Sequence, residues 1–197
     1  MGSIHDLKPD LIRTMCFIDG YYLRKNTLDL FNNKNIDFEK LHCKIAEIMK
    51  EGLLFPQFVR IFYYDAIVDP TKATQEDYLN QKAYFDTINS LDFYEVKLGE
   101  LIQLEDGKMR QKGVDVFLSI DMVKKAYENH YEWAVLIAGD GDYVETVKAV
   151  KDTGKRVYGC YFDQHTSQNL KAALDKGFVL DKHTGLIEIL KTAKYSA

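Results

Sequence analysis

The sequence has few cysteines, few prolines and no long apolar run. Its three cysteines, Cys16, Cys43 and Cys160, include no C-x-x-C pair, which argues against a disulfide framework or a cysteine-rich zinc site. Cys16 and Cys160 fall in apolar, strand-like segments, so we expect buried free thiols and a reducing, cytoplasmic compartment. No apolar run approaches the ~18 residues of a membrane-spanning helix, and the N-terminus lacks the apolar segment of a signal peptide. We therefore expect no membrane association.

An excess of positive charge is also missing. The formal net charge is −4, so no general basic field indicates a protein that coats nucleic acid. This argues less against an enzyme, because carboxylates that bind a metal count as negative until the metal is bound. The five histidines show no zinc-ligand spacing, and the glycine-rich phosphate-binding motifs G-x-G-x-x-G and G-x-x-x-x-G-K-[ST] do not occur. A zinc site and a nucleotide-cofactor site therefore lose their main support.

What is present is ordinary globular composition, with 46% hydrophobic and 28% charged residues. A chain of 197 residues fits one domain better than two. We expect an N-terminal extension over residues 1–12, one domain over residues 13–191 and a C-terminal tail over residues 192–197. Apolar runs alternate with helical patterns, which is typical of β-α-β units and a mainly parallel sheet. The predicted fold is a doubly wound α/β sandwich with helices on both faces of the sheet.

The pattern predicts the following elements. Expected strands cover residues 14–18, 58–64, 93–98, 133–138, 156–162 and 177–180, and residues 101–104 are expected to pair near the third of these. Expected helices lie within residues 21–31 and over residues 37–50, 73–90, 114–129, 143–152, 167–174 and 186–191. Asp37 is the expected N-cap of the second helix, and residues 105–108 are an expected turn.

Acidic residues fall where the predicted strands end. Asp19 ends the first strand, and Asp140 and Asp142 follow the strand over residues 133–138. Sites in such sheets form outside the carboxyl ends of the strands. Gly139 and Gly141 remove side chains at this point, so the backbone is able to approach a ligand closely.

Asp115 completes a set of four acidic residues, because it lies in the first turn of a predicted helix that begins at the same edge of the sheet. Mg²⁺ and Mn²⁺ take oxygen ligands, and a cation offsets the repulsion among gathered carboxylates. Any one of these residues alone is equally well explained as a cap or turn residue. The four together predict a divalent-metal site built from Asp19, Asp115, Asp140 and Asp142.

At these residues the chain resembles the NYN-domain, LabA-like family of the PIN-like ribonuclease superfamily. The similar segments are residues 17–23 (FIDGYYL), 111–116 (QKGVDV), 136–143 (LIAGDGDY) and 154–157 (GKRV). The resemblance implies a three-layer PIN-like α/β sandwich and a phosphodiesterase that hydrolyses RNA with metal-activated water. It implies that Asp19, Asp115, Asp140 and Asp142 are catalytic and bind Mg²⁺ or Mn²⁺. Two positions depart from the family: Tyr22 stands where Asn is usual, and Ala138 where Ser is common.

Five further residues are candidates for binding the substrate, which we expect to be single-stranded RNA. Tyr21 and Tyr22 adjoin Asp19 and would stack on a base, or else pack beneath the first loop. Lys108, Arg110 and Lys112 precede the predicted helix at Val114 and would meet phosphates, or else form a solvated loop. The chain shows no appended RNA-binding module, so specificity is expected from a protein partner; a homo-oligomer also remains open.

Two other acidic residues are weaker candidates. Asp121 lies six residues after Asp115 on the same predicted helix and faces a different side, so an ion pair or a cap is expected for it. Asp65 ends the strand over residues 58–64 and would border the site.

Two alternative functions stay open. One is a PIN-like module that binds RNA or protein without turnover, which Tyr22 and the negative net charge favour. The other is a metal-dependent phosphatase, against which the missing second Asp of a D-x-D pair after Asp19 counts.

Overall fold

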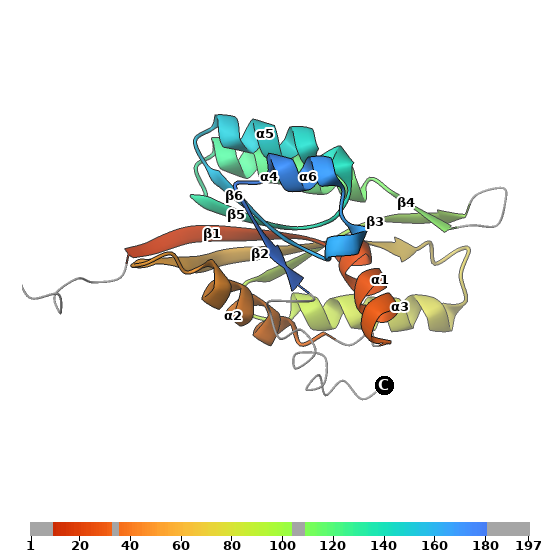
Figure 1. Ribbon diagram of the computed structural model, residues 1–197. Coiled ribbons are helices and arrows are strands. Elements are labelled where there is room, and N and C mark those ends of the chain that lie inside the picture. The colour runs from red at the N-terminus through yellow and green to blue at the C-terminus, as the bar shows by residue number, and fades with distance from the viewer. Residues whose placement is uncertain (1–9, 33–35, 104–108, 181–197) are drawn as a thin grey trace, which may run out of the picture.

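The computed structural model describes residues 10–32, 36–103 and 109–180. A seven-stranded sheet in the order β4-β3-β2-β1-β5-β6-β7 forms the middle layer, and helices cover both of its faces (Figure 1). All neighbouring strands are parallel except β3 and β4. The chain builds the sheet outward from β1 in one direction through β2 and β3, and then in the other through β5, β6 and β7. The predicted α/β sandwich with a mainly parallel sheet is confirmed.

The elements have the following bounds. The strands are β1 (Asp10–Asp19), β2 (Leu54–Val68), β3 (Tyr94–Gln103), β4 (Met109–Lys112), β5 (Trp133–Ile137), β6 (Arg156–Tyr161) and β7 (Lys176–Val179). The helices are α1 (Gly20–Phe31), α2 (Phe38–Met49), α3 (Gln75–Asn89), α4 (Val114–Tyr127), α5 (Val144–Asp152) and α6 (Gln168–Ala173), with short 3₁₀ helices η2 (Gly141–Tyr143) and η3 (Asp163–His165).

Two hydrophobic cores lie on the opposite faces of the sheet because side chains alternate along each strand. On β1, Cys16 and Ile18 face the core formed with α1, α2 and α3. Met15 and Phe17 face the second core, to which α4, α5 and α6 contribute. Figure 1 shows these two groups of helices on opposite sides of the sheet. Both faces of β1 and β5 are covered, which explains why these strands read as continuous apolar runs.

Three details of the predicted elements are wrong. Residues 101–103 do not form a separate strand, since β3 runs without a break to Gln103. β2 does not close at Asp65 but continues to Val68. Residues 109–112 form the antiparallel edge strand β4 instead of a loop. The expected N-cap is confirmed, because the side chain of Asp37 accepts a hydrogen bond from the backbone N–H of Lys40.

The remaining expectations concern cysteines, membrane helices and the chain ends. Cys16 and Cys160 are buried free thiols, as predicted, and Cys43 is exposed. Every helix in the described part of the chain is too short or too polar to span a bilayer. The turn expected over residues 105–108 and the helix expected over residues 186–191 lie outside the described residues.

Candidate metal centre in a cleft at the sheet edge

The acidic residues gather where the order of the sheet reverses. β1 and β5 are parallel neighbours at the centre of the sheet, and the chain leaves them toward opposite edges. Such a reversal point in a parallel sheet leaves a crevice beyond the carboxyl ends of the two strands. Here a cleft of about 860 Å³ extends from this place along the ends of β2 and β3 to α3 and β4, and Asp19, Asp115 and Asp140 all line it. The structure therefore brings together three of the four predicted carboxylates.

Asp19 is held in place by the start of α1. It is the N-cap of that helix, and its Oδ1 accepts a hydrogen bond of 2.9 Å from the backbone N–H of Tyr22. The side chain is nearly buried, at 9% exposure. Burial, opposed by the hydrogen bond from Tyr22 and reinforced by the charges of Asp115 and Asp65, raises the pKa of Asp19 to about 7. The folded protein without a cation thus disfavours the ionised form of this carboxyl group.

Tyr143 joins Asp19 to Asp115. Its hydroxyl donates to Oδ1 of Asp115 at 2.9 Å and lies 3.4 Å from Oδ2 of Asp19. Burial and the two carboxylates raise the pKa of Tyr143 far above its ordinary value, so the phenol keeps its proton. Both carboxylates are therefore positioned around one hydroxyl, which holds two like charges close to each other.

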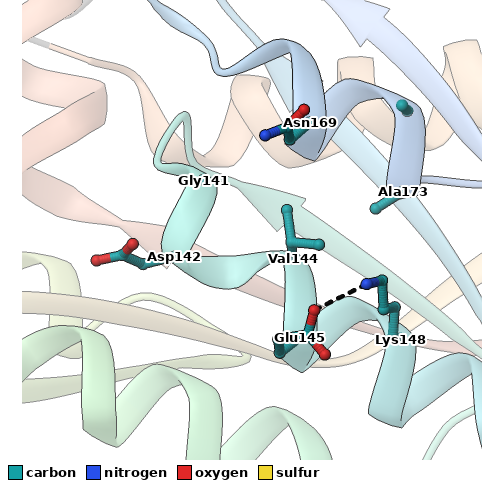
Figure 2. A pocket seen from close by; sticks show the side chains of 8 residues that line it. Gly141, Asp142, Val144, Glu145, Lys148, Asn169 and Ala173 are labelled. Atoms are coloured by element: carbon teal, nitrogen blue, oxygen red, sulfur yellow. Dashed lines mark hydrogen bonds and ion pairs between the residues drawn. The ribbon is translucent and has the colours of Figure 1, made fainter.

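Asp140 and Asp142 follow β5 but face different spaces. Asp140 is exposed and caps η2, because its Oδ1 accepts from the backbone N–H of Asp142 at 3.0 Å. Asp142 is also exposed, and it lines a neighbouring pocket of about 680 Å³ between η2, α5 and α6. Figure 2 shows its carboxylate pointing away from the ion pair of Glu145 and Lys148 in that pocket. Of the two, only Asp140 lines the cleft with Asp19 and Asp115.

The donor set fits a divalent cation that is held by few protein ligands. Among the ion pairs formed by the described residues, none involves Asp19, Asp115 or Asp140. Within the described residues, no three acidic, histidine or cysteine side chains lie close enough to hold a metal by themselves. Mg²⁺ commonly takes only one or two carboxylates and completes its shell with water and substrate phosphate. Asp19 and Asp115, which share the hydroxyl of Tyr143 and form no ion pair among the described residues, match that requirement.

Tyr22 packs within the fold. Its hydroxyl accepts from the backbone N–H of Phe162 at 2.8 Å and is hydrogen-bonded to Thr166 at 2.7 Å. Its ring lies against Phe162. A side chain at Gly139 would overlap this ring, since its Cβ would lie 2.2 Å from a carbon of Tyr22. Tyr22 therefore fastens α1 to the end of β6, which is the packing alternative and not the stacking one.

The other predicted substrate residues differ in position. Tyr21 is half exposed and lines the cleft. Arg110 is exposed on β4 and also lines it, whereas Lys112 is exposed on the same strand and is not part of the lining. Lys108 lies outside the described residues.

Several cleft residues were not predicted from the sequence. They include Arg24 of α1 and a polar row on α3 formed by Asn80, Gln81 and Tyr84. The phenol of Tyr143, which lies behind the lining and binds Asp115, was not predicted either. Helical spacing in the sequence could have indicated the residues of α1 and α3. Gln81 and Tyr84 are three residues apart and so share a helix face, and Arg24 lies one helical turn after Gly20.

The two weaker acidic candidates have structural partners. Asp121 accepts from the hydroxyl of Tyr64 at 2.9 Å and forms an ion pair with Lys97, which confirms the expected structural role. Asp65 is fully buried and paired with Arg24 in the wall of the cleft, so it borders the site only through that arginine.

The fold and the cleft define an α/β protein of the PIN-like, nuclease-type class. The chain belongs to the NYN domain family, whose model matches residues 13–181. NYN domains are generally nucleases, so at this coarse level the family supports a hydrolase.

The solved structures support the fold. A crystal structure of a protein of unknown function from Vibrio parahaemolyticus superposes with a TM-score of 0.64 at 18% identity, covering 93% of this chain and 99% of that one. At this level of identity the similarity concerns the fold alone. No curated protein matches the sequence.

Proposed function

We propose that this protein is a divalent-metal-dependent ribonuclease that hydrolyses phosphodiester bonds of single-stranded RNA. The observation that carries the proposal is the cleft lined by Asp19, Asp115 and Asp140, three carboxylates that form no ion pair within the described part of the chain. Membership of the NYN domain family supports a nuclease, and the family model matches a segment that contains all three of these residues.

The residues of the chain would act on the substrate in distinct ways. Asp19 and Asp115 would hold Mg²⁺ or Mn²⁺, while Asp140 would reach the ion directly or through water. When bound, the ion supplies an activated water and neutralises charge on the phosphate. Tyr143 keeps the two carboxylates in place through its hydroxyl. Attack of water on phosphorus with departure of the 3′-oxygen would leave 5′-phosphate and 3′-hydroxyl ends.

Substituting Asp140 by asparagine tests this proposal. Asparagine keeps an oxygen that accepts from the N–H of Asp142, so the cap of η2 survives while the charge is lost. We expect Mn²⁺-dependent cleavage of a labelled single-stranded RNA to fall by at least a hundredfold and cleavage in EDTA to be absent for both proteins.

A matched control is Asp92→Asn, which removes an equal charge from an exposed turn outside the cleft. It should cleave like the wild type. Unchanged turnover in Asp140→Asn would overturn the assignment, and binding of RNA without any Mn²⁺-dependent cleavage would leave the non-catalytic RNA-binding module as the function.

A further inference from the structure

Arg24 is a cationic side chain in the wall of the acidic cleft, and it is fixed from behind. Its Nε donates to Oδ2 of Asp65 and its Nη2 to Oδ1, both at 2.9 Å. The arginine side chain is about one third exposed, whereas that of Asp65 is completely buried. The guanidinium therefore has one side turned to the protein interior and another available to the cleft.

The carboxylate of Asp65 is saturated with donors. Besides the two from Arg24, it accepts from the backbone N–H of Ala66, from Gln111 Nε2 at 2.8 Å and from the hydroxyl of Tyr63. A carboxylate with about four lone-pair positions has no room for a metal ion after five such contacts. Asp65 consequently serves as an anchor for Arg24 and not as a ligand.

The local sequence explains how Arg24 reaches this place. Gly20, one helical turn earlier, lies so close to Tyr63 that a Cβ there would come within 2.4 Å of the ring. The missing side chain lets the first turn of α1 approach the carboxyl half of β2 at Tyr63. The next turn then lies beside the buried carboxylate at the carboxyl half of β2, where Arg24 meets Asp65.

A contribution to the stability of the fold does not by itself explain the ion pair of Arg24 and Asp65. A buried ion pair stabilises a fold little, because desolvation of both charges offsets their attraction. The pair does fix the guanidinium plane, which lowers the conformational entropy that Arg24 would lose on binding a ligand. None of the hydrogen bonds among the described residues uses Nη1, so both of its N–H groups remain for a ligand in the cleft.

We propose that Arg24, anchored by Asp65 and assisted by Arg110, which lines the same cleft, binds a phosphate of the RNA chain next to the one that is cleaved. The inference rests on the proposed function for the identity of the ligand. Arginine presents N–H groups to phosphate oxygens in a planar fork, and a fixed one selects the register of the strand. Arg24 is thus a positioning residue for the substrate backbone, and Tyr21 on the same helix lies beside it on the cleft wall.

The test measures RNA binding without cleavage. Anisotropy of a labelled single-stranded RNA is recorded in EDTA at several KCl concentrations, beginning at low salt. The key variant is the double substitution Arg24→Gln with Asp65→Asn, which removes both halves of the pair and leaves the net charge unchanged. We expect about tenfold weaker binding at low salt and a slope of log K against log salt smaller by roughly 0.7, the value for one lost phosphate contact on a single strand.

Arg60→Gln is the matched control. Arg60 is exposed on β2, five residues before Asp65 and roughly 16 Å away along the strand. Arg60→Gln removes a positive charge, whereas the double variant of Arg24 and Asp65 keeps the net charge. Arg60→Gln should nevertheless weaken RNA binding less than the double variant does. Equal or weaker binding by Arg60→Gln overturns the proposal, as does wild-type affinity in the double variant.

Two further measurements keep the result decisive. Thermal denaturation shows whether the double variant folds; if it does not, Arg24→Lys retains the charge without the fork and should bind several-fold more weakly. Wild-type affinity of a folded Arg24→Lys protein then overturns the proposal, and so does a wild-type protein that binds no RNA in EDTA. The readout is binding and not cleavage, so the two proposals can fail separately. If the wild type cleaves RNA but the Arg24 variants bind RNA as tightly as the wild type, phosphate binding by Arg24 is refuted and the proposed ribonuclease function stands.

Discussion

The buried charge of Asp19 destabilises the metal-free protein, although the proposed function requires that charge to bind a metal ion. Its pKa is about 7 in the folded protein against 3.8 for the free group, because of burial and of the nearby charges of Asp115 and Asp65. Since the folded pKa lies above the unfolded one, its contribution to stability is fully present below pH 4 and is lost as the pH rises to 7. The metal-free protein should therefore gain stability if this charge is removed.

Substitution of Asp19 by asparagine tests this conflict. In EDTA at pH 8 we expect the variant to unfold with a free energy about 2–4 kcal/mol higher than the wild type, while the two converge near pH 4. An asparagine oxygen still accepts from the N–H of Tyr22, so the start of α1 is retained. Urea denaturation at both pH values measures the difference, and Mn²⁺-dependent cleavage should be lost. Parallel pH profiles for the two proteins would refute the argument.

Tyr143 offers a second test at the scale of one atom. Replacing it with phenylalanine removes the hydroxyl that both Asp115 and Asp19 approach. We expect a loss of about 1–2 kcal/mol in unfolding free energy. Since Tyr143 does not line the cleft, kcat should fall about tenfold with little change in KM.

Tyr131→Phe is the control for this substitution. Tyr131 is equally buried in the same core, and its hydroxyl donates to the backbone carbonyl of Met122. It should show a similar loss of stability without the change in kcat. A kcat unchanged in Tyr143→Phe would mean that the hydroxyl does not position the carboxylates.

At the scale of elements, Gly139 lies where α1 and η3 both come close to the residues that follow β5. A Cβ at this position would lie 2.2 Å from the ring of Tyr22 and 2.4 Å from the backbone oxygen of His165. We expect Gly139→Ala to lower the unfolding free energy by about 2–3 kcal/mol. It should also reduce cleavage, because Asp140 is the next residue.

Gly141→Ala is the comparison, since its Cβ would meet only Ser167, with the nearest atom 3.0 Å away at the end of a rotatable side chain. Gly141→Ala should lower the unfolding free energy by less than about 1 kcal/mol. Thermal denaturation of both variants decides the point, and equal costs would show that the approach of Tyr22 is not the reason for a glycine at position 139.

Elements with strong periodicity were predictable from the sequence, and elements defined by their partners were not. β5 is apolar throughout because both faces of the sheet are covered, and α2 carries its own N-cap in Asp37. β4, in contrast, is a short polar strand at the edge of the described sheet, where it pairs with the end of β3. Nothing within Met109–Lys112 specifies that pairing, so the sequence alone favoured a loop.

The same distinction applies to the candidate site. The convergence of Asp19, Asp115 and Asp140 followed from the positions of strand ends and one helix start. Arg24 and Tyr143 could not be placed in this way, because their roles depend on which side chains lie opposite them in space. Asp142 shows the limit of the rule, since two residues further along the same turn it lines a different pocket.

At the scale of the molecule, the net charge of −4 opposes the approach of RNA, and Asp19, Asp115 and Asp140 add local negative charge in the cleft. A divalent ion bound by Asp19 and Asp115 would neutralise the charge of these two carboxylates, so metal loading and RNA binding should be coupled. The coupling is measurable in the Asp140→Asn variant, which keeps both carboxylates but should not consume the RNA.

We expect Mn²⁺ to tighten the binding of single-stranded RNA to Asp140→Asn about tenfold, compared with KCl at equal ionic strength. The triple variant that also carries Asp19→Asn and Asp115→Asn should bind RNA in EDTA at least as well as Asp140→Asn, since two repelling charges are gone, yet should show no response to Mn²⁺. Anisotropy titrations give both quantities. A response that persists in the triple variant would place the ion elsewhere on the protein or on the RNA itself, and the acidic cleft would then have no part in recruiting the substrate.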